Sequence, residues 1–312
     1  MENGRGGKKQ KISLPILLAA LAVVVLGVLP SALGSSWPVW LHLRSAPQPA
    51  GSFAVHFIDV GQGDCALIES GGQFMIIDGG ERGAENTVTA YLQDRGVKKL
   101  DYVVATHAHS DHIGGLAYGV LPRFPAGEII APRYSEESMP TTKTYEKFLE
   151  AVAARVEDGA KATYAKPGTQ YTLGDASFEV LGPLEDTGDE YNNSSVVILL
   201  EYGGARFLFT GDVEKSAEKA LVKTYGEGLR ADVLKVPHHG SSTSSTKNLL
   251  DAVQPAYAVI CCGQDNSYNH PNAAVVARLL EHGITVLRTD LDGTIVMTVD
   301  GGVKITKERG MG

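Results

Sequence analysis

One short stretch of this 312-residue chain supplies three imidazoles and a carboxylate, at His107, His109, Asp111 and His112. The apolar, β-branched run before them, residues 100–105, predicts a buried strand. Side chains that come directly after such a strand have a rigid support and face open space. Neutral imidazoles and carboxylates are ligands for zinc, iron or manganese. The spacing lets His107 and His109 converge on one ion, while Asp111 and His112 reach a second.

Two more loops that follow predicted strands carry candidate ligands. Asp212 comes after an apolar strand, and although a Gly-Asp pair is a common turn, beside the histidine motif this carboxylate can bridge two metals ~3.5–4 Å apart. His238 and His239 also follow a strand. One of them can complete the shell of the second ion, and the other then points at the substrate. Ser241 in the same loop can donate a hydrogen bond to a bound oxyanion.

Two carboxylates, Asp64 and Asp78, stand in glycine-rich turns near the start of the predicted domain. We expect Asp78 to hydrogen-bond the free nitrogen of a ligand histidine, the usual arrangement around metal sites. Asp64 can do the same or contact the substrate. Because aspartate beside glycine also forms turns for purely structural reasons, that interpretation stays open for both residues.

Charge and cysteine content limit the partners of the chain. The net charge is −8, and because residues 1–50 carry +4, the remainder carries −12. An acidic domain does not bind polyanions tightly by charge alone, so a phosphate-bearing substrate needs the metal ions as its local positive charge. Cys65, Cys261 and Cys262 have no spacing typical of a zinc knuckle or a disulfide framework. We expect them to be buried thiols.

Basic residues at the N-terminus precede an uncharged run from Ile12 to Leu41. This pattern predicts a signal peptide or an uncleaved signal anchor over residues 1–34, followed by a proline-containing linker over residues 35–52. An anchor would form one N-terminal hydrophobic helix and make the membrane a partner. The catalytic domain would then be extracytoplasmic at the cell membrane, or secreted if the segment is cleaved.

The remaining residues, 53–308, are predicted to form one large α/β domain. Short strand-like runs occur in both halves, with a sharp turn expected at Ile113–Gly115. Helices are expected at 84–95, 144–157, 213–225, 246–253 and 272–282. This order predicts two β-sheets packed face to face with helices outside.

Together these stretches resemble the metallo-β-lactamase superfamily. The resemblance covers roughly Phe53 to Val299 and is strongest at His107–Gly115, Thr210–Asp212 and Val236–Ser242. Residues 59–64, 235–242 and 268–271 are similar to the hydrolase domain attached to ComEC-type competence (DNA-uptake) proteins, here without the polytopic channel. The resemblance implies a four-layer αββα sandwich, an α/β (α+β) fold, with two divalent metal ions, zinc or manganese, at one edge of the paired sheets.

The resemblance also implies roles for the candidate residues by matching position. His107 and His109 would bind the first metal, Asp212 would bridge, and the second metal would be bound by Asp111, His112 and His239. His238 would then face the substrate as an acid. His270 falls in a loop that lies near the site in this family, with a solely structural role as the alternative.

One departure from the superfamily pattern concerns the first metal. Many members supply a third histidine from the loop before the strand that leads to the bridging aspartate, but residues 191–197 contain none. ComEC-type domains share this Asn/Ser-rich version, and we expect water or Asn193 to complete the shell. Weaker, more exchangeable occupancy follows, favouring manganese over zinc.

Three functional hypotheses follow. The first is a metal-dependent phosphodiesterase or nuclease that acts on a phosphodiester such as single-stranded DNA and is linked to DNA uptake or processing. A hydroxide held by both ions would attack phosphorus, Asp111 would orient the water, and His238 would protonate the leaving oxygen. The second is a lactonase or β-lactamase-like acyl hydrolase, and the third is a non-catalytic, membrane-anchored binding module. No protein partner can be inferred.

Overall fold

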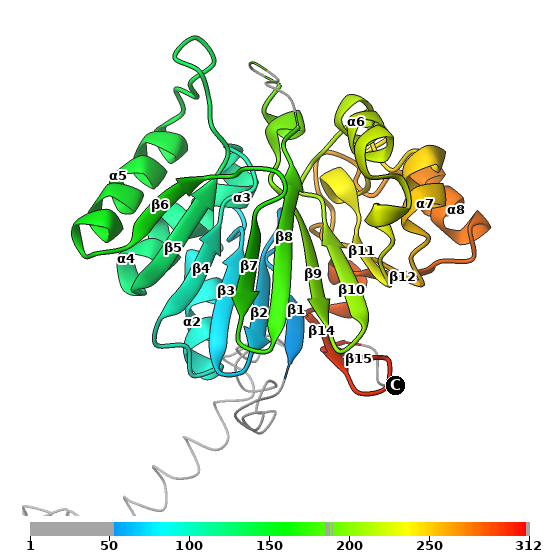
Figure 1. Ribbon diagram of the computed structural model, residues 1–312, viewed down its shortest axis with the longest axis horizontal. Helices are drawn as coiled ribbons and strands as arrows, with labels where there is room; N and C mark the ends of the chain where they lie inside the picture. The colour runs from blue at the N-terminus through cyan, green and yellow to red at the C-terminus, as the bar shows by residue number, and fades with distance from the viewer. Residues whose placement is uncertain (1–52, 185–187, 189, 310–312) are drawn as a thin grey trace, which may run out of the picture. The chain divides into compact units, whose positions relative to one another are not determined.

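The computed structural model describes residues 53–309 apart from 185–187 and 189 (Figure 1). The predicted signal or anchor at residues 1–34 and the linker at 35–52 lie outside the described residues. Within the described part, no helix combines the length and the apolar character that a membrane span requires.

Two β-sheets form the centre of the domain. The first has the strand order β15-β14-β1-β2-β3-β4-β5-β6, and the second has the order β13-β12-β11-β10-β9-β8-β7. The strands of the first sheet are β1 (Ala54–Phe57), β2 (Ala66–Ser70), β3 (Gln73–Ile77), β4 (Leu100–Val104), β5 (Ala126–Ala131), β6 (Lys161–Tyr164), β14 (Ile295–Val299) and β15 (Val303–Lys307). Those of the second are β7 (Gln170–Leu173), β8 (Ala176–Gly182), β9 (Val197–Tyr202), β10 (Ala205–Phe209), β11 (Val233–Lys235), β12 (Tyr257–Ile260) and β13 (Thr285–Arg288).

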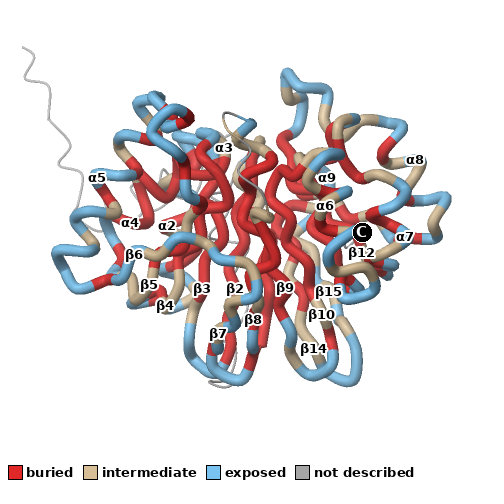
Figure 2. The backbone as a smooth tube through the Cα atoms, turned by 45° about the horizontal axis from the view of Figure 1, so that its top comes forward, coloured by how far each residue is buried: buried red, intermediate tan, exposed pale blue. Residues whose placement is uncertain are grey.

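The two sheets pack through side chains that alternate along each strand. On β10, Phe207 and Phe209 belong to the core between the sheets, whereas Leu208 belongs to a second core on the opposite face. β1 adds Val55 and Phe57 to the core between the sheets. A strand directs successive side chains to opposite faces, so every second residue reaches the same core. Burying each large side chain contributes about 1.5–3 kcal/mol, and Figure 2 shows the buried strands at the centre of the domain.

Helices cover the outer faces of both sheets (Figure 1). Leucines of α6, α7 and α8 pack with Leu208 and form the apolar core outside the second sheet. The helices are α2 (Glu85–Asp94), α3 (Ser110–Gly115), α4 (Leu121–Arg123), α5 (Lys143–Glu157), α6 (Lys215–Tyr225), α7 (Lys247–Val253), α8 (Ala273–Glu281) and α9 (Thr289–Asp292), with a π-helical turn η2 (Leu116–Val120) and 3-10 turns η3 (Tyr191–Ser194), η4 (Gly226–Leu229) and η5 (Pro237–Gly240). The predicted arrangement of two sheets between outer helices is confirmed.

Two local predictions from the sequence need correction. The expected sharp turn at Ile113–Gly115 is instead the end of α3. Its two glycines pack so tightly on residues 79–82 that an added Cβ would collide with backbone atoms there, which explains glycine inside a helix. β6 and β7 were not predicted, because each has only four residues and most of their side chains are exposed, so any alternation is too short to stand out.

The loops that carry the candidate residues begin at one edge of the paired sheets. β10 and β11 are parallel neighbours with Phe209 opposite Lys235, so the loops after them start side by side. In the other sheet, β4 runs parallel to β3 and β5. The Thr106 carbonyl just after β4 accepts a 2.9 Å hydrogen bond from Val196 N just before β9, which joins the two sheets at this edge.

Candidate metal centre

The histidine motif folds as a short loop that runs directly into a helix. His107 is buried just after β4, and His109 is the N-cap residue of α3, whose first turn carries Asp111 and His112. The His109 carbonyl accepts 3.1 Å hydrogen bonds from His112 N and Ile113 N. A helix places residues that follow one another on different sides of its axis. The N-terminus of α3 therefore fixes the directions of the motif side chains.

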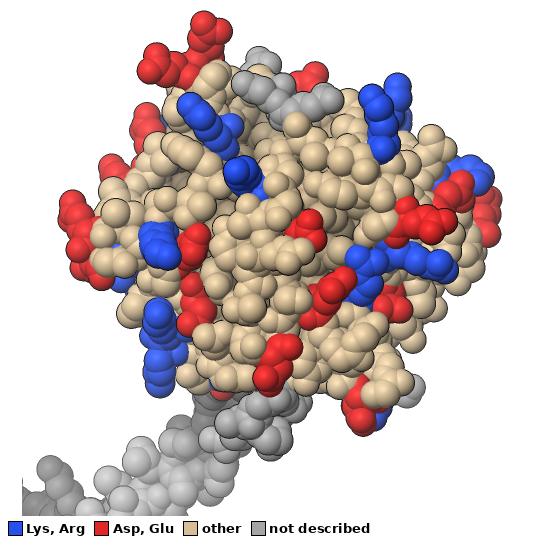
Figure 3. Space-filling model, in the orientation of Figure 1, with Lys and Arg blue, Asp and Glu red and all other residues tan. Residues whose placement is uncertain are grey.

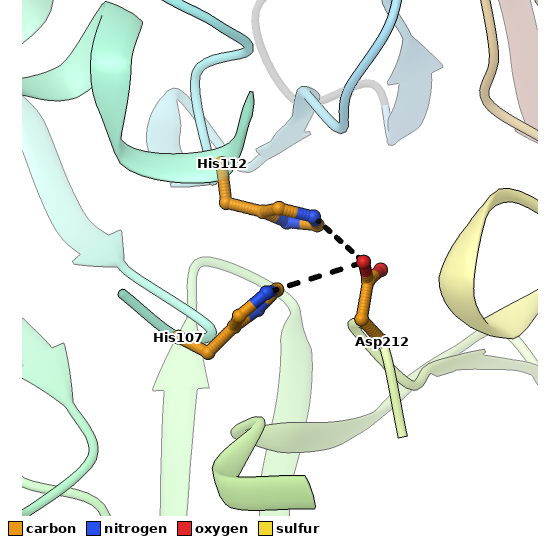
Figure 4. Close-up of side chains that lie close together, drawn as sticks. All are labelled: His107, His112 and Asp212. Carbon is orange, nitrogen blue, oxygen red and sulfur yellow. Dashed lines mark ion pairs between the residues drawn. The ribbon is translucent and has the colours of Figure 1, made fainter. Parts of the chain in front are cut away.

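The Asp212 carboxylate is the point on which the histidines converge. Its Oδ2 atom lies 3.2 Å from His112 Nε2, 3.3 Å from His239 Nε2 and 3.9 Å from His107 Nε2. Figure 4 shows His107 and His112, both from the loop and helix after β4, directed at Asp212 from the loop after β10. His109 joins this group through His107, with 3.1 Å between His107 Nε2 and His109 Nδ1. Three segments distant in the sequence thus meet at one carboxylate oxygen.

Asp111 joins the centre through contacts with His239 and His112. Its Oδ2 is 3.3 Å from His239 Nε2, and Asp111, His112 and His239 present ligand atoms within 4.8 Å of one another. His107, His112 and Asp212 form a second group within the same limit. The six residues predicted as ligands are therefore brought together by the fold.

The atoms at this centre fit divalent metal ions. His112 Nε2, His239 Nε2 and Asp212 Oδ1 are buried and make no hydrogen bond, although the two nitrogens lie close to Asp212. Buried polar atoms in proteins are normally hydrogen-bonded, and exceptions require an explanation such as an ion. Imidazole nitrogens and carboxylate oxygens that converge without hydrogen bonding match the donor set of zinc, iron or manganese.

The Nδ1 atoms of His112 and His239 contact oxygen atoms on the side away from Asp212 Oδ2. Asp78 is fully buried and lies 2.8 Å from His112 Nδ1, and it also accepts hydrogen bonds from Thr106 N at 2.8 Å and Thr106 Oγ1 at 2.7 Å. His239 Nδ1 lies 2.8 Å from the Cys261 carbonyl oxygen. Such partners fix the tautomer in which Nε2 is the free ligand atom. The contact expected for Asp78 from the sequence is made with His112.

Charge at the centre favours cations in place of protons. Although burial opposes it, His112 and His239 hold the pKa of Asp212 well below its usual range. Burial likewise opposes protonation of His112, but Asp212 and Asp78 raise its pKa well above the usual value. His107 behaves differently, because burial lowers its pKa. Metal binding must release the protons on the raised histidines, so metals and protons compete for this centre.

An open cleft leads from solvent to this centre. It has a volume of about 460 Å³, and its lining includes His109, Asp111, Asp212, His238 and His270. The His238 side chain is 21% exposed and its Nε2 lies 3.9 Å from Asp212 Oδ2.

His238 and His239 both have a φ of +51°, a backbone conformation uncommon for residues other than glycine that occurs mainly where the surroundings enforce it. Ser241 is buried outside the cleft lining and its hydroxyl bonds to Thr243 Oγ1, so the oxyanion contact expected from the sequence is not supported by its position.

A family model described as the metallo-beta-lactamase superfamily matches residues 58–264. The chain belongs to the metallo-β-lactamase superfamily. Membership indicates a metal-dependent hydrolase, and it confirms the resemblance inferred from the motifs.

Two relatives match most of this chain. Competence protein ComA of Neisseria gonorrhoeae is 34% identical over 304 residues, covering 95% of this chain and 40% of that protein. ComE operon protein 3 of Bacillus subtilis is 33% identical over 259 residues, covering 77% of this chain and 32% of that protein. The chain thus spans only about a third to two fifths of these relatives.

Solved structures share the fold. Igni18, described as a novel metallo hydrolase from the archaeon Ignicoccus hospitalis, matches with a TM-score of 0.52 at 17% identity, covering 79% of this chain and 100% of that chain. At this identity the likeness supports the metallo-β-lactamase fold and nothing finer.

The position at which many superfamily members carry a third histidine holds two asparagines with different environments. The Asn193 amide is occupied at both ends, since Nδ2 donates to Glu190 Oε2 at 3.0 Å and Oδ1 accepts from Glu214 N at 3.0 Å. These hydrogen bonds do not favour Asn193 over water for completing the first metal shell. Burial lowers the pKa of His109, and the neighbouring Asn192 opposes that shift. Asn192 Nδ2 donates to Glu214 Oε1 at 3.2 Å, but its buried Oδ1 makes no hydrogen bond. Asn192 is the better candidate of the two.

Lys235 was missed as a site residue from the sequence. It is buried at the end of β11, forms an ion pair with Asp64 Oδ2, and its Nζ lies 3.7 Å from Asp212 Oδ1. Burial alone would lower the pKa of Lys235, but Asp64 and Asp212 raise it. The signal was available, because Val233 faces the core between the sheets and alternation directs Lys235 to the same side. A lysine at such a position must be paired.

Proposed function

We propose that this protein is a metal-dependent phosphodiesterase that cleaves single-stranded DNA in connection with DNA uptake. The observation that carries the proposal is the convergence of His107, His112 and His239 on Asp212 at an open cleft, in a chain similar to competence proteins. Phosphodiesters carry negative charge, and the chain after residue 50 has a net charge of −12. On the face in Figure 3, the visible Lys and Arg side chains are scattered among Asp and Glu and form no continuous basic patch.

Two divalent cations held by these residues would activate a water molecule and neutralise charge on the phosphoryl oxygens. Asp111, at the cleft beside His239, would orient that water through a hydrogen bond. Because the metal ligands and Asp111 are already held in place by the fold, little movement of side chains is needed to orient the water during the reaction.

His238 would hold the proton for the leaving oxygen. Its Nδ1 lies 3.3 Å from Glu214 Oε1 and 3.2 Å from Thr243 Oγ1, which leaves Nε2 directed to the cleft. A carboxylate behind an imidazole fixes the orientation of the ring. General acid catalysis of this kind typically contributes 10²–10⁴-fold to the rate.

The test is hydrolysis of bis(p-nitrophenyl) phosphate and of single-stranded DNA by the purified full chain with added Mn²⁺ or Zn²⁺. His109→Ala and Asp212→Ala should each abolish metal-dependent turnover. His282→Ala is a matched control, because His282 lies away from the cleft and pairs with Asp251. Equal activity of the parent and the two site variants would refute the proposal. Turnover of nitrocefin without phosphodiester turnover would favour acyl hydrolysis instead.

A further inference from the structure

The rim of the metal cleft carries an exposed aromatic ring. Tyr268 is 64% exposed, and it lines the same cleft as Asp111, Asp212 and His238. Another strongly exposed tyrosine, Tyr164, lies beneath the guanidinium of Arg133. Exposure of a large aromatic side chain at a cleft costs solvation free energy that packing does not recover, so it points to a binding role.

A row of rings connects Tyr268 to the metal centre. The rings of Tyr268 and His270 are stacked, with centroids 5.7 Å apart and an interplanar angle of 22°. His270 in turn lies with its centroid 6.1 Å from that of His239, at 30°. One face of Tyr268 therefore rests on His270, and the exposed part of the ring at the cleft is accessible to a planar group.

The loop that presents Tyr268 is fixed by one asparagine. Asn266 Oδ1 accepts hydrogen bonds from Tyr268 N at 3.2 Å and His270 N at 3.0 Å, while its Nδ2 donates to the carbonyls of Gly263 at 2.9 Å and His270 at 2.5 Å. Gly263 N donates to Gln62 Oε1 at 3.2 Å, which ties the loop to the opposite segment. A ring held in place before binding loses little conformational entropy when a ligand stacks on it.

We propose that Tyr268, supported by His270, is a stacking platform for a nucleobase next to the scissile phosphate, which makes single-stranded nucleic acid the substrate class of this cleft. This inference rests on the proposed phosphodiesterase function and specifies its substrate. Stacking is the source of affinity that an acidic protein retains when charge cannot attract the backbone. Because every base has a π-face, the platform selects for an unpaired base and not for a sequence.

The experiment measures kcat/KM of the full chain with Mn²⁺ on a thymidine dinucleotide and on two analogues that lack the base on the 5′ or the 3′ side. One missing base should lower kcat/KM of the parent by about 5- to 150-fold, the range expected for loss of one stacked base. Tyr268→Ala should lower kcat/KM on the intact dinucleotide by the same factor. On the analogue whose missing base lowers the kcat/KM of the parent, Tyr268→Ala should have no further effect. Tyr268→Phe should retain parental kcat/KM.

Leu280→Ala is the matched control, because Leu280 is 59% exposed on α8 and lies outside the cleft lining. A parent that hydrolyses no phosphodiester would refute the proposed function itself. A parent that hydrolyses the dinucleotide while Tyr268→Ala matches it would refute only the stacking platform. An equal loss on the dinucleotide and both analogues would also refute it, since the tyrosine would then act on the fold of the cleft.

Discussion

Replacing Asp78 by Asn should separate metal affinity from folding. Asp78 accepts the Nδ1 proton of His112, which leaves Nε2 as the ligand atom. In Asp78→Asn the retained oxygen can still accept from Thr106 N, and the new NH₂ group then faces His112 Nδ1 and Thr106 Oγ1. An imidazole that accepts at Nδ1 must carry its proton at Nε2. The variant therefore stabilises the tautomer of His112 that cannot bind a metal.

The expected loss follows from the bond that is exchanged. A hydrogen bond to a charged group contributes about 1.5–3 kcal/mol, and changes to such supporting partners typically lower metal affinity 10–100-fold. The two estimates agree, because 10–100-fold corresponds to about 1.4–2.7 kcal/mol. The metal-free protein should still fold, but its free energy of unfolding should fall by about 1.5–3 kcal/mol, because Asp78 raises the pKa of His112 and the amide replaces a hydrogen bond between charged groups.

The assay is a calorimetric titration of the full chain with Mn²⁺ and Zn²⁺, together with urea unfolding of the metal-free protein. Asp101→Asn is a matched control, because Asp101 accepts from Phe74 N outside the metal centre. Parental metal affinity in a folded Asp78→Asn protein would contradict the tautomer argument. A variant that fails to fold would contradict the expected loss of about 1.5–3 kcal/mol.

Three further outcomes are expected. Glu69→Gln should lower the free energy of unfolding by about 3 kcal/mol at pH 7. Burial opposes ionisation of Glu69, but the contact with His56 and the ion pair with Arg95 lower its pKa from 4.5 to about 2. This contribution is lost as the pH falls through about 2, so the urea unfolding curves of parent and variant should converge there. Lys235→Met removes the cation paired with the buried Asp64 carboxylate and leaves it beside His239 Nδ1 at 3.3 Å. This should cost about 3–5 kcal/mol in urea unfolding, largely recovered by adding Asp64→Asn; no recovery would contradict the pairing. Asn192→Ala should weaken one of two Mn²⁺ binding steps in calorimetry, whereas Asn193→Ala should reduce stability and leave both steps intact; the reverse pattern would exclude Asn192 as a partner of the first ion.

The sheets and outer helices could be predicted because burial is strong along most of the chain. β10 alternates between two apolar cores, and α5 has its apolar residues at helical spacing, so hydrophobic period alone assigns both. β6 and β7 were not predicted because these edge strands are stabilised mainly by backbone pairing, which the pattern of side chains does not reveal. The helical end of α3 was not predicted because its glycines are required by close backbone contact and not by helix propensity.

Some residues of the candidate site could also be predicted from the sequence, and others could not. His107, His109, Asp111 and His112 could be recognised because a single helix start groups them, and Asp212 and His239 because each directly follows a strand of the same sheet. The pairing of Asp78 with His112 depended only on residue type near a metal motif.

The sequence could not show which of two adjacent, chemically identical residues takes a given role in the site. Asn192 and Asn193 have equal chemistry and adjacent positions in the 3-10 turn η3. Both amides contact Glu214, but the Asn193 oxygen accepts a hydrogen bond from Glu214 N, whereas the Asn192 oxygen is buried beside His109 without one. The same holds for His238 and His239, two left-handed residues in succession, of which His239 is buried 3.3 Å from Asp212 Oδ2 while His238 is partly exposed and pairs with Glu214. Assignment of first-metal and acid roles therefore depends on backbone conformation in two short turns. Substitutions that change these turns should alter metal binding and proton transfer without removing any ligand.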